Sequence, residues 1–107
     1  MWWSASILMK TTSSSAEPLS APFEENIVLI KAPDEAAAME EAQKIGRQGE
    51  HQYTSVTKDD IVVRFDRVLS VYQILHEELT NGVEVFSRFL RQSEAESLQI
   101  PFNDEEA

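Results

Sequence analysis

The sequence predicts an α+β fold: an antiparallel β-sheet of about four strands, in the order β-β-α-β-β, with one main helix packed on one face. Several segments show the period of two, or the short apolar runs, that are typical of β-strands. One stretch rich in alanine and glutamate carries the start and stop signals of a helix. The dipeptide Asn81–Gly82 is typical of a β-hairpin turn.

The first two strands are expected at residues 2–10 and 23–31, joined by a polar loop with two prolines. In the first strand, alternation sends alternate residues to opposite faces: Trp3, Ala5, Ile7 and Met9 to one, and Trp2, Ser4, Ser6 and Leu8 to the other. The second strand contains the continuous apolar run Ile27–Ile30. Such a run is typical of a strand that is covered on both faces or central in its sheet.

The main helix is expected to begin at Pro33 and Asp34 and to end at Gly46 or Gly49. A carboxylate in its first turn and cations near its end suit the helix dipole. Its apolar stripe consists of Ala38, Met39, Ala42 and Ile45. Because alanine is small, this stripe allows the helix to lie close to the sheet.

The sequence of the second half of the chain predicts further strands. A short extended piece is expected around Tyr53–Val56. Residues 61–75 are rich in β-branched and aromatic side chains and indicate one long strand or two, with a register-restoring bulge near Asp66 and Arg67. Residues 83–90, after the Asn-Gly turn, are the expected return strand.

The chain length of 107 residues fits one domain. We expect residues 1–92 to form a single α+β domain and residues 93–107 to form an acidic C-terminal tail. Ser93 and Glu96 have the spacing of a capping box, which predicts a short helical turn, and the acidic end of the tail is expected to fray.

Composition narrows the classes of function. Nine Lys and Arg stand against nineteen Asp and Glu, which gives a formal net charge of −10. This charge repels phosphate backbones and anionic lipid, so neither nucleic-acid binding through a general basic surface nor membrane adsorption is expected. It suits a basic protein partner. The chain has no cysteine, which excludes disulfides and thiolate chemistry and fits a cytoplasmic protein. No cofactor is expected.

Three segments together resemble a known bacterial family, the domain of unknown function 4288. They are WWSASILM at the start, ENIVLIKAPDEAAAMEEAQKIG in the middle, and VVRFDRVLSVYQI followed by NGVEVFSRFL. The resemblance covers roughly residues 2–90 and supports the same fold. It implies no activity and no catalytic residues, because the family has none to transfer. The Ser/Thr-rich loop and the tail after Leu90 depart from the family pattern.

The polar residues show no pattern typical of a catalytic or metal site. His51 and His76 lie in expected polar connections, where three or four converging metal ligands are not expected. An enzyme that uses His51 or His76 with nearby carboxylates is the least favoured hypothesis. Four arginines fall on strands expected to pair, where they either form a local basic patch for an anion or bridge to acidic neighbours. These are Arg64, Arg67, Arg88 and Arg91.

Large apolar side chains are expected on both faces of the sheet, and one helix covers only one face. Trp2 and Trp3 point to opposite faces because they are neighbours on a strand. Leaving one such ring exposed forfeits about 4–6 kcal/mol, at 25 cal/mol per Å² of apolar area. The second face is therefore expected to be covered by curling of the sheet, by the C-terminal tail, or by another chain, of which a homodimer is the simplest.

These patterns together predict a small non-catalytic protein-interaction module that self-associates. The expected partner-binding residues are Trp2, Trp3, Phe86, Leu90, Arg64 and Arg88. The alternative is an acidic inhibitor or immunity-type protein that neutralises a basic toxin or nuclease, a hypothesis based on the net charge alone.

Overall fold

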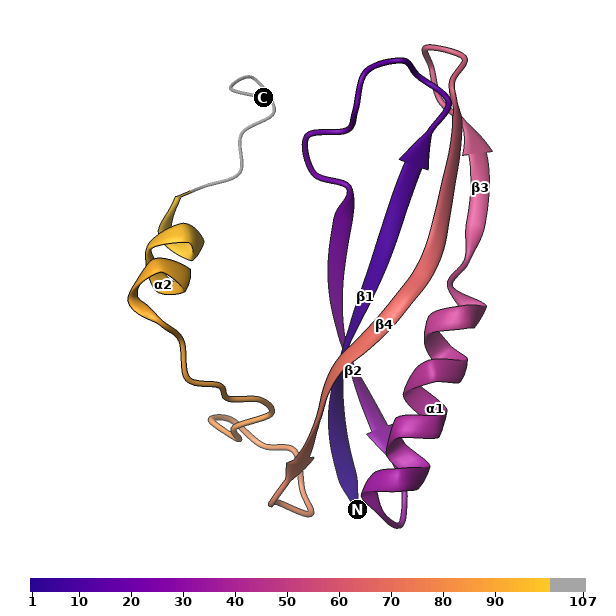
Figure 1. Ribbon diagram of the computed structural model, residues 1–107. Coiled ribbons are helices and arrows are strands. Elements are labelled where there is room, and N and C mark those ends of the chain that lie inside the picture. The colour runs from indigo at the N-terminus through magenta and orange to yellow at the C-terminus, as the bar shows by residue number, and fades with distance from the viewer. Residues whose placement is uncertain (101–107) are drawn as a thin grey trace.

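A computed structural model describes residues 1–100 of the chain. The elements are β1 (Trp2–Ser13), β2 (Phe23–Lys31), α1 (Glu35–Gln48), β3 (His51–Thr54), β4 (Asp60–Ile74) and α2 (Gln92–Gln99). The strands form one antiparallel sheet in the order β2-β1-β4-β3, and α1 lies along one face of it (Figure 1). The predicted α+β fold and its element order are therefore confirmed. The fraying expected at the acidic end lies outside the described residues.

The hydrophobic core lies between α1 and the face of the sheet that carries it, here called the inner face. The inner side chains of β1 are Trp3, Ala5, Ile7 and Met9, and none is more than 5 % exposed. β1 pairs with β2 on one side and β4 on the other, so these side chains have apolar neighbours on both flanks. The central place of β1 explains why its alternation is the most regular in the chain. The opposite face of the sheet is called the outer face below.

α1 begins and ends at residues that the sequence indicates. The carboxylate of Asp34 accepts a hydrogen bond from the backbone N–H of Ala37 at 2.8 Å, which satisfies one of the free amides of the first turn. Gly49, the second of the two expected terminators, follows the last helical residue. Ala38 and Ala42 are fully buried, so α1 lies close to the sheet as predicted.

β4 runs along the sheet as one long strand with two bulges. Two register shifts against β1 leave Asp66 and Leu69 without a partner on that strand. The first is the bulge predicted near Asp66 and Arg67. The second has no counterpart in the sequence-based prediction. It reverses the alternation again, so Val68 and Val71 both pack against the core although they are three residues apart.

The fourth strand is not the one expected. β3 pairs with the first residues of β4, whereas residues 83–90, the expected return strand, form no strand. The turn at Asn81–Gly82 does form, and Gly82 adopts a positive φ of 86°. However, residues 75–80 before the turn are not a strand either, so the hairpin has no first strand to pair with. The prediction of a return strand was therefore wrong.

β2 is an edge strand, which corrects the expectation that its apolar run is central or covered on both faces. Val28 and Ile30 face the core, while Ile27 and Leu29 point to the outer face and are 52 % and 48 % exposed. The side chains of this run therefore lie in two different environments, the core and the exposed outer face. Within residues 1–100, no helix is long and apolar enough to span a lipid bilayer.

Candidate interaction surface

The outer face is partly covered by residues 84–88, here called the cover segment. The Tyr72 hydroxyl of β4 donates a hydrogen bond to Glu84 Oε1 at 2.6 Å. The Ser4 hydroxyl of β1 donates to the Val85 carbonyl. Phe86 packs edge-on against the Tyr72 ring, with 6.0 Å between the ring centroids. These contacts hold the cover segment over the half of the outer face that contains Ser4.

Two serines of β1, Ser4 and Ser6, are buried on the outer face. Ser4 and Ser6 are each 1 % exposed although both lie on the outer face. Ser4 is satisfied by the cover segment, and Ser6 donates to the carboxylate of Glu25 on β2. Each buried hydroxyl therefore has a partner, as buried polar groups require.

Other parts of the outer face carry exposed apolar side chains among charged ones. We define the outer apolar patch as four side chains that are each about half exposed: Phe23, Ile27 and Leu29 from β2 and Leu69 from β4. Leu69 lines a recess on this face together with Ser70, Phe86 and Arg88. The cover segment therefore reaches the edge of the patch and leaves the β2 side uncovered. Exposed apolar clusters of this kind are typical of interaction sites.

The two tryptophans lie on opposite faces, as the alternation predicts. Trp3 is buried in the core, and its indole Nε1 donates to the Ala32 carbonyl at 3.0 Å. Trp2 lies on the outer face, is partly buried, and has the Lys31 ammonium 5.7 Å from its ring centroid. Trp3 was expected to bind a partner, but only 5 % of it is exposed, so it offers a partner little surface.

The other expected partner-binding residues are spread along the chain. Phe86 belongs to the cover segment and is partly buried against Tyr72. Leu90 lies beyond the cover segment and is 38 % exposed. Arg88 lines the recess beside Leu69, and Arg64 lies on β4.

Strand pairing does not bring the four arginines together, because residues 83–90 do not pair with β4. Arg67 forms an ion pair with Asp66 at 2.6 Å, and Arg91 forms one with Glu94 at 2.9 Å. Both are local pairs on exposed surface, which contribute little to stability. A different basic cluster is present on the outer face, because Arg64 lies directly opposite Lys10 of β1 in the strand register.

Neither histidine belongs to a convergent site. His51 stacks on Tyr53, with ring centroids 6.0 Å apart, and its Nδ1 lies 2.9 Å from the Gly49 carbonyl. His76 is exposed in the connection after β4. Among residues 1–100, no three His, Asp or Glu side chains are placed to hold a metal ion together.

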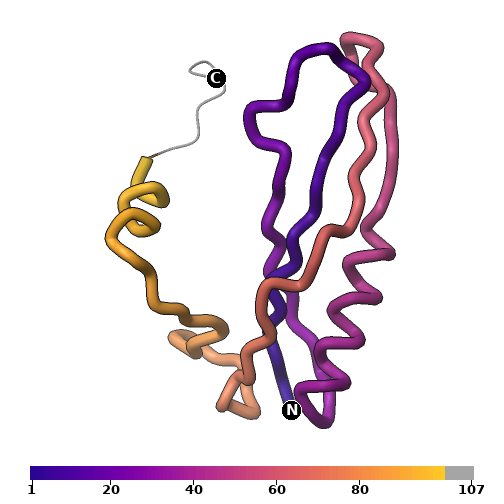
Figure 2. Tube along the Cα trace, viewed as in Figure 1, coloured from indigo at the N-terminus to yellow at the C-terminus, as the bar shows by residue number. Residues whose placement is uncertain are grey.

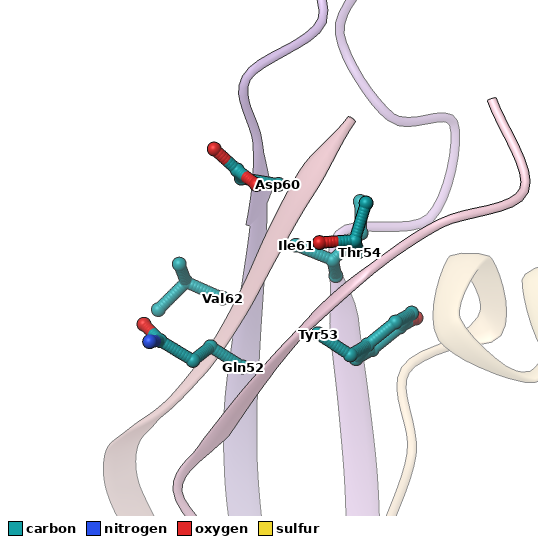
Figure 3. A pocket seen from close by; sticks show the side chains of 6 residues that line it. All are labelled: Gln52, Tyr53, Thr54, Asp60, Ile61 and Val62. Carbon is teal, nitrogen blue, oxygen red and sulfur yellow. The ribbon is translucent and has the colours of Figure 1, made fainter. Parts of the chain in front are cut away.

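Two hollows on the described part of the chain show which polar side chains its concave surfaces bring together. One hollow of about 460 Å³ lies on the β3–β4 pair and is lined by Gln52, Tyr53, Thr54, Asp60, Ile61 and Val62 (Figure 3). Tyr53 lies opposite Ile61 and Gln52 opposite Val62, so successive pairs alternate between the two faces of the sheet. By the same alternation Gln52, Thr54 and Asp60 lie on one face of this strand pair and Tyr53 lies on the other. A second cleft, of about 320 Å³, lies between the C-terminal end of α1 and β2, and its polar lining residues are Glu24, Asn26 and His51.

The residues of the outer apolar patch were not among the expected partner-binding residues. The sequence does indicate two of the patch residues, Ile27 and Leu29. Strand alternation within the run Ile27–Ile30 places both of them on the face away from the helix. The strand order, which places β2 at the edge, cannot be read from the run itself.

The hydrogen bond between Tyr72 and Glu84 gives a prediction for pH. Hydrogen bonds from Tyr72 and then Ser87 hold the pKa of Glu84 below its ordinary value of 4.5. Because the folded-state pKa is lowered, this contribution to stability is present above pH 4.5 and is lost as the pH falls through the folded-state pKa. A carboxyl-carbon NMR titration should therefore show the Glu84 pKa rising toward 4.5 in Tyr72→Phe. An unchanged pKa would contradict the placement of the cover segment.

Comparisons with known proteins identify a family and nothing further. The model of the family described as Domain of unknown function (DUF4288) matches residues 2–87. A search of curated proteins and a search of solved structures each gave no match. The matched residues include the whole sheet, α1 and the cover segment as far as Ser87. The chain therefore belongs to the family described as Domain of unknown function (DUF4288).

Proposed function

We propose that this chain is a small non-catalytic protein-interaction module that self-associates through the outer face of its sheet. The observation that carries the proposal is the outer apolar patch, which remains open after the cover segment has occupied its own part of that face. Ile27 and Leu29 alternate with the core residues Val28 and Ile30, so the β2 part of the patch lies on a regular strand.

The energetics favour a second chain over water on this surface. Full burial of an isoleucine or leucine side chain stabilises by about 1.5–3 kcal/mol, and each patch side chain is about half exposed. In a twofold dimer the same patch contributes twice, since both copies present it. β2 is also an edge strand, and an apolar edge strand tends to pair or pack with another chain.

The test is the oligomeric state of the full chain and of two matched variants. Sedimentation equilibrium of the wild-type chain should give twice the 12.1 kDa mass of one chain. Ile27→Asp should weaken the dimer by about 100-fold, because it buries a carboxylate with no partner. Val56→Asp is the control, since Val56 is 99 % exposed in the loop between β3 and β4.

Val56→Asp should leave the dissociation constant unchanged, because the same charge is added away from the outer face. A wild-type chain that sediments at the mass of one chain, or two variants that dissociate equally, would contradict the proposal.

A further inference from the structure

Residues 89–100, here called the arm, leave the sheet that the rest of the chain forms. Within the described part of the chain, α2 contacts no other helix or strand, and Figures 1 and 2 show it standing apart from the sheet. Phe89 is fully exposed, and Leu98 and Ile100 are 64 % and 70 % exposed. The arm therefore carries large apolar side chains that its own chain does not cover.

The arm has little to stabilise it alone. α2 has eight residues, and helices this short are marginal in water unless they pack against something. Its first turn is held by Glu94, which accepts hydrogen bonds from the Arg91 backbone N–H and Nε, both at 2.9 Å. Ala95 and Leu98, three residues apart, lie on neighbouring positions of one side of α2. An apolar surface that packs against this side of α2 would supply the contacts that so short a helix needs for stability.

The outer face has the charge and polarity that such an arm requires. The strand register places Lys10 opposite Arg64 and Leu8 opposite Arg67, so the basic residues lie on the outer face beside the patch. Lys10 Nζ also lies 5.6 Å from the ring centroid of Phe23, a patch residue. The arm carries Glu94 and Glu96 against the single cation Arg91. Its glutamates are opposite in charge to Lys10 and Arg64 of the outer face, and this attraction offsets part of the repulsion between two chains that each carry a net charge of −10.

We propose that the partner of each outer apolar patch is the arm of a second copy of this chain, so that two copies exchange arms. This inference rests on the self-association proposed above and names its contact. The cover segment stays on its own sheet through Tyr72 and Ser4, and the chain leaves that sheet after it. A twofold axis makes the exchange reciprocal, so two patches are covered by two arms.

Cysteine cross-linking in the full chain tests the exchange, and the absence of native cysteine makes it specific. Chains with Ile27→Cys and chains with Leu98→Cys are mixed and treated with a short bifunctional thiol reagent. The mixture should give a covalent dimer in several-fold higher yield than a matched mixture of Val56→Cys and Leu98→Cys chains. All three positions, Ile27, Leu98 and Val56, are exposed in the single chain, so folding should be preserved.

The outcomes separate this inference from the proposed function. The double variant Ile27→Cys/Leu98→Cys should give cross-linked dimers. Cross-linked single chains would mean that each arm folds onto its own patch, and would overturn the exchange. A wild-type chain that sediments as a dimer, with no excess cross-linking in the mixture, would overturn the exchange and leave self-association standing. A wild-type chain that sediments as a monomer would overturn both.

Discussion

Replacing Trp3 with alanine should destabilise the protein by about 3–5 kcal/mol, the range for removing a buried tryptophan. Trp3 is 5 % exposed in the core between the sheet and α1. The substitution removes the largest ring of the core and leaves the Ala32 carbonyl without the indole donor now 3.0 Å away. Denaturant unfolding followed by far-ultraviolet circular dichroism measures the change without depending on tryptophan fluorescence.

Trp2→Ala is the matched control, since it removes the same side chain from the neighbouring position. Trp2 is only partly buried, on the outer face, so we expect a loss of about 1 kcal/mol for the single chain. Equal losses for the two substitutions would mean that the two rings do not lie on opposite faces of the sheet.

Gly46→Ala should destabilise the protein by about 1–3 kcal/mol, although alanine is the better helix former. A Cβ atom built at position 46 would lie 2.3 Å from Phe65 Cδ1 and 2.7 Å from Cε1, far inside van der Waals contact. The ring is not free to move without loss, because the Arg47 guanidinium lies 5.6 Å from its centroid. The steric cost therefore exceeds the roughly 1 kcal/mol gained in helix propensity.

A double-mutant cycle identifies the cause of that loss. If the clash with the Phe65 ring is responsible, Gly46→Ala combined with Phe65→Leu should be destabilised by less than the sum of the two single changes. Strict additivity in thermal or denaturant unfolding would show that the ring at position 65 is not what excludes a side chain at position 46.

Local patterns in the sequence predict the half of the molecule that contains α1. The alternation of β1, the Asp34 cap and the alanine stripe of α1 each depend on residues close together in the chain, and all agree with the structure. The bulge at Asp66 is also visible, because the apolar parity of β4 changes there. These features follow from local propensity and periodicity, which a single sequence carries.

The parts of the fold that the sequence did not predict depend on contacts between residues that are far apart in the chain. Residues 83–90 have the alternation of a strand, yet Tyr72 and Ser4 bond to Glu84 and Val85 and hold that segment across the outer face. The exposure of Ile27 depends on β2 being at the edge of the sheet, which the strand order alone decides. The candidate surface was therefore only partly predictable: the sequence indicates a second apolar face, but not which residues of it stay open.

Solvent paramagnetic relaxation of assigned methyl groups tests the central claim, that the open outer face is covered in solution by another copy. The probe compares Ile27 and Leu29 with two internal references, Ile30 at 3 % exposure and Val56 at 99 %. At concentrations where the chain associates, we expect the Ile27 and Leu29 methyls to be nearly as protected as those of Ile30. Relaxation of both residues close to that of Val56 would contradict the account.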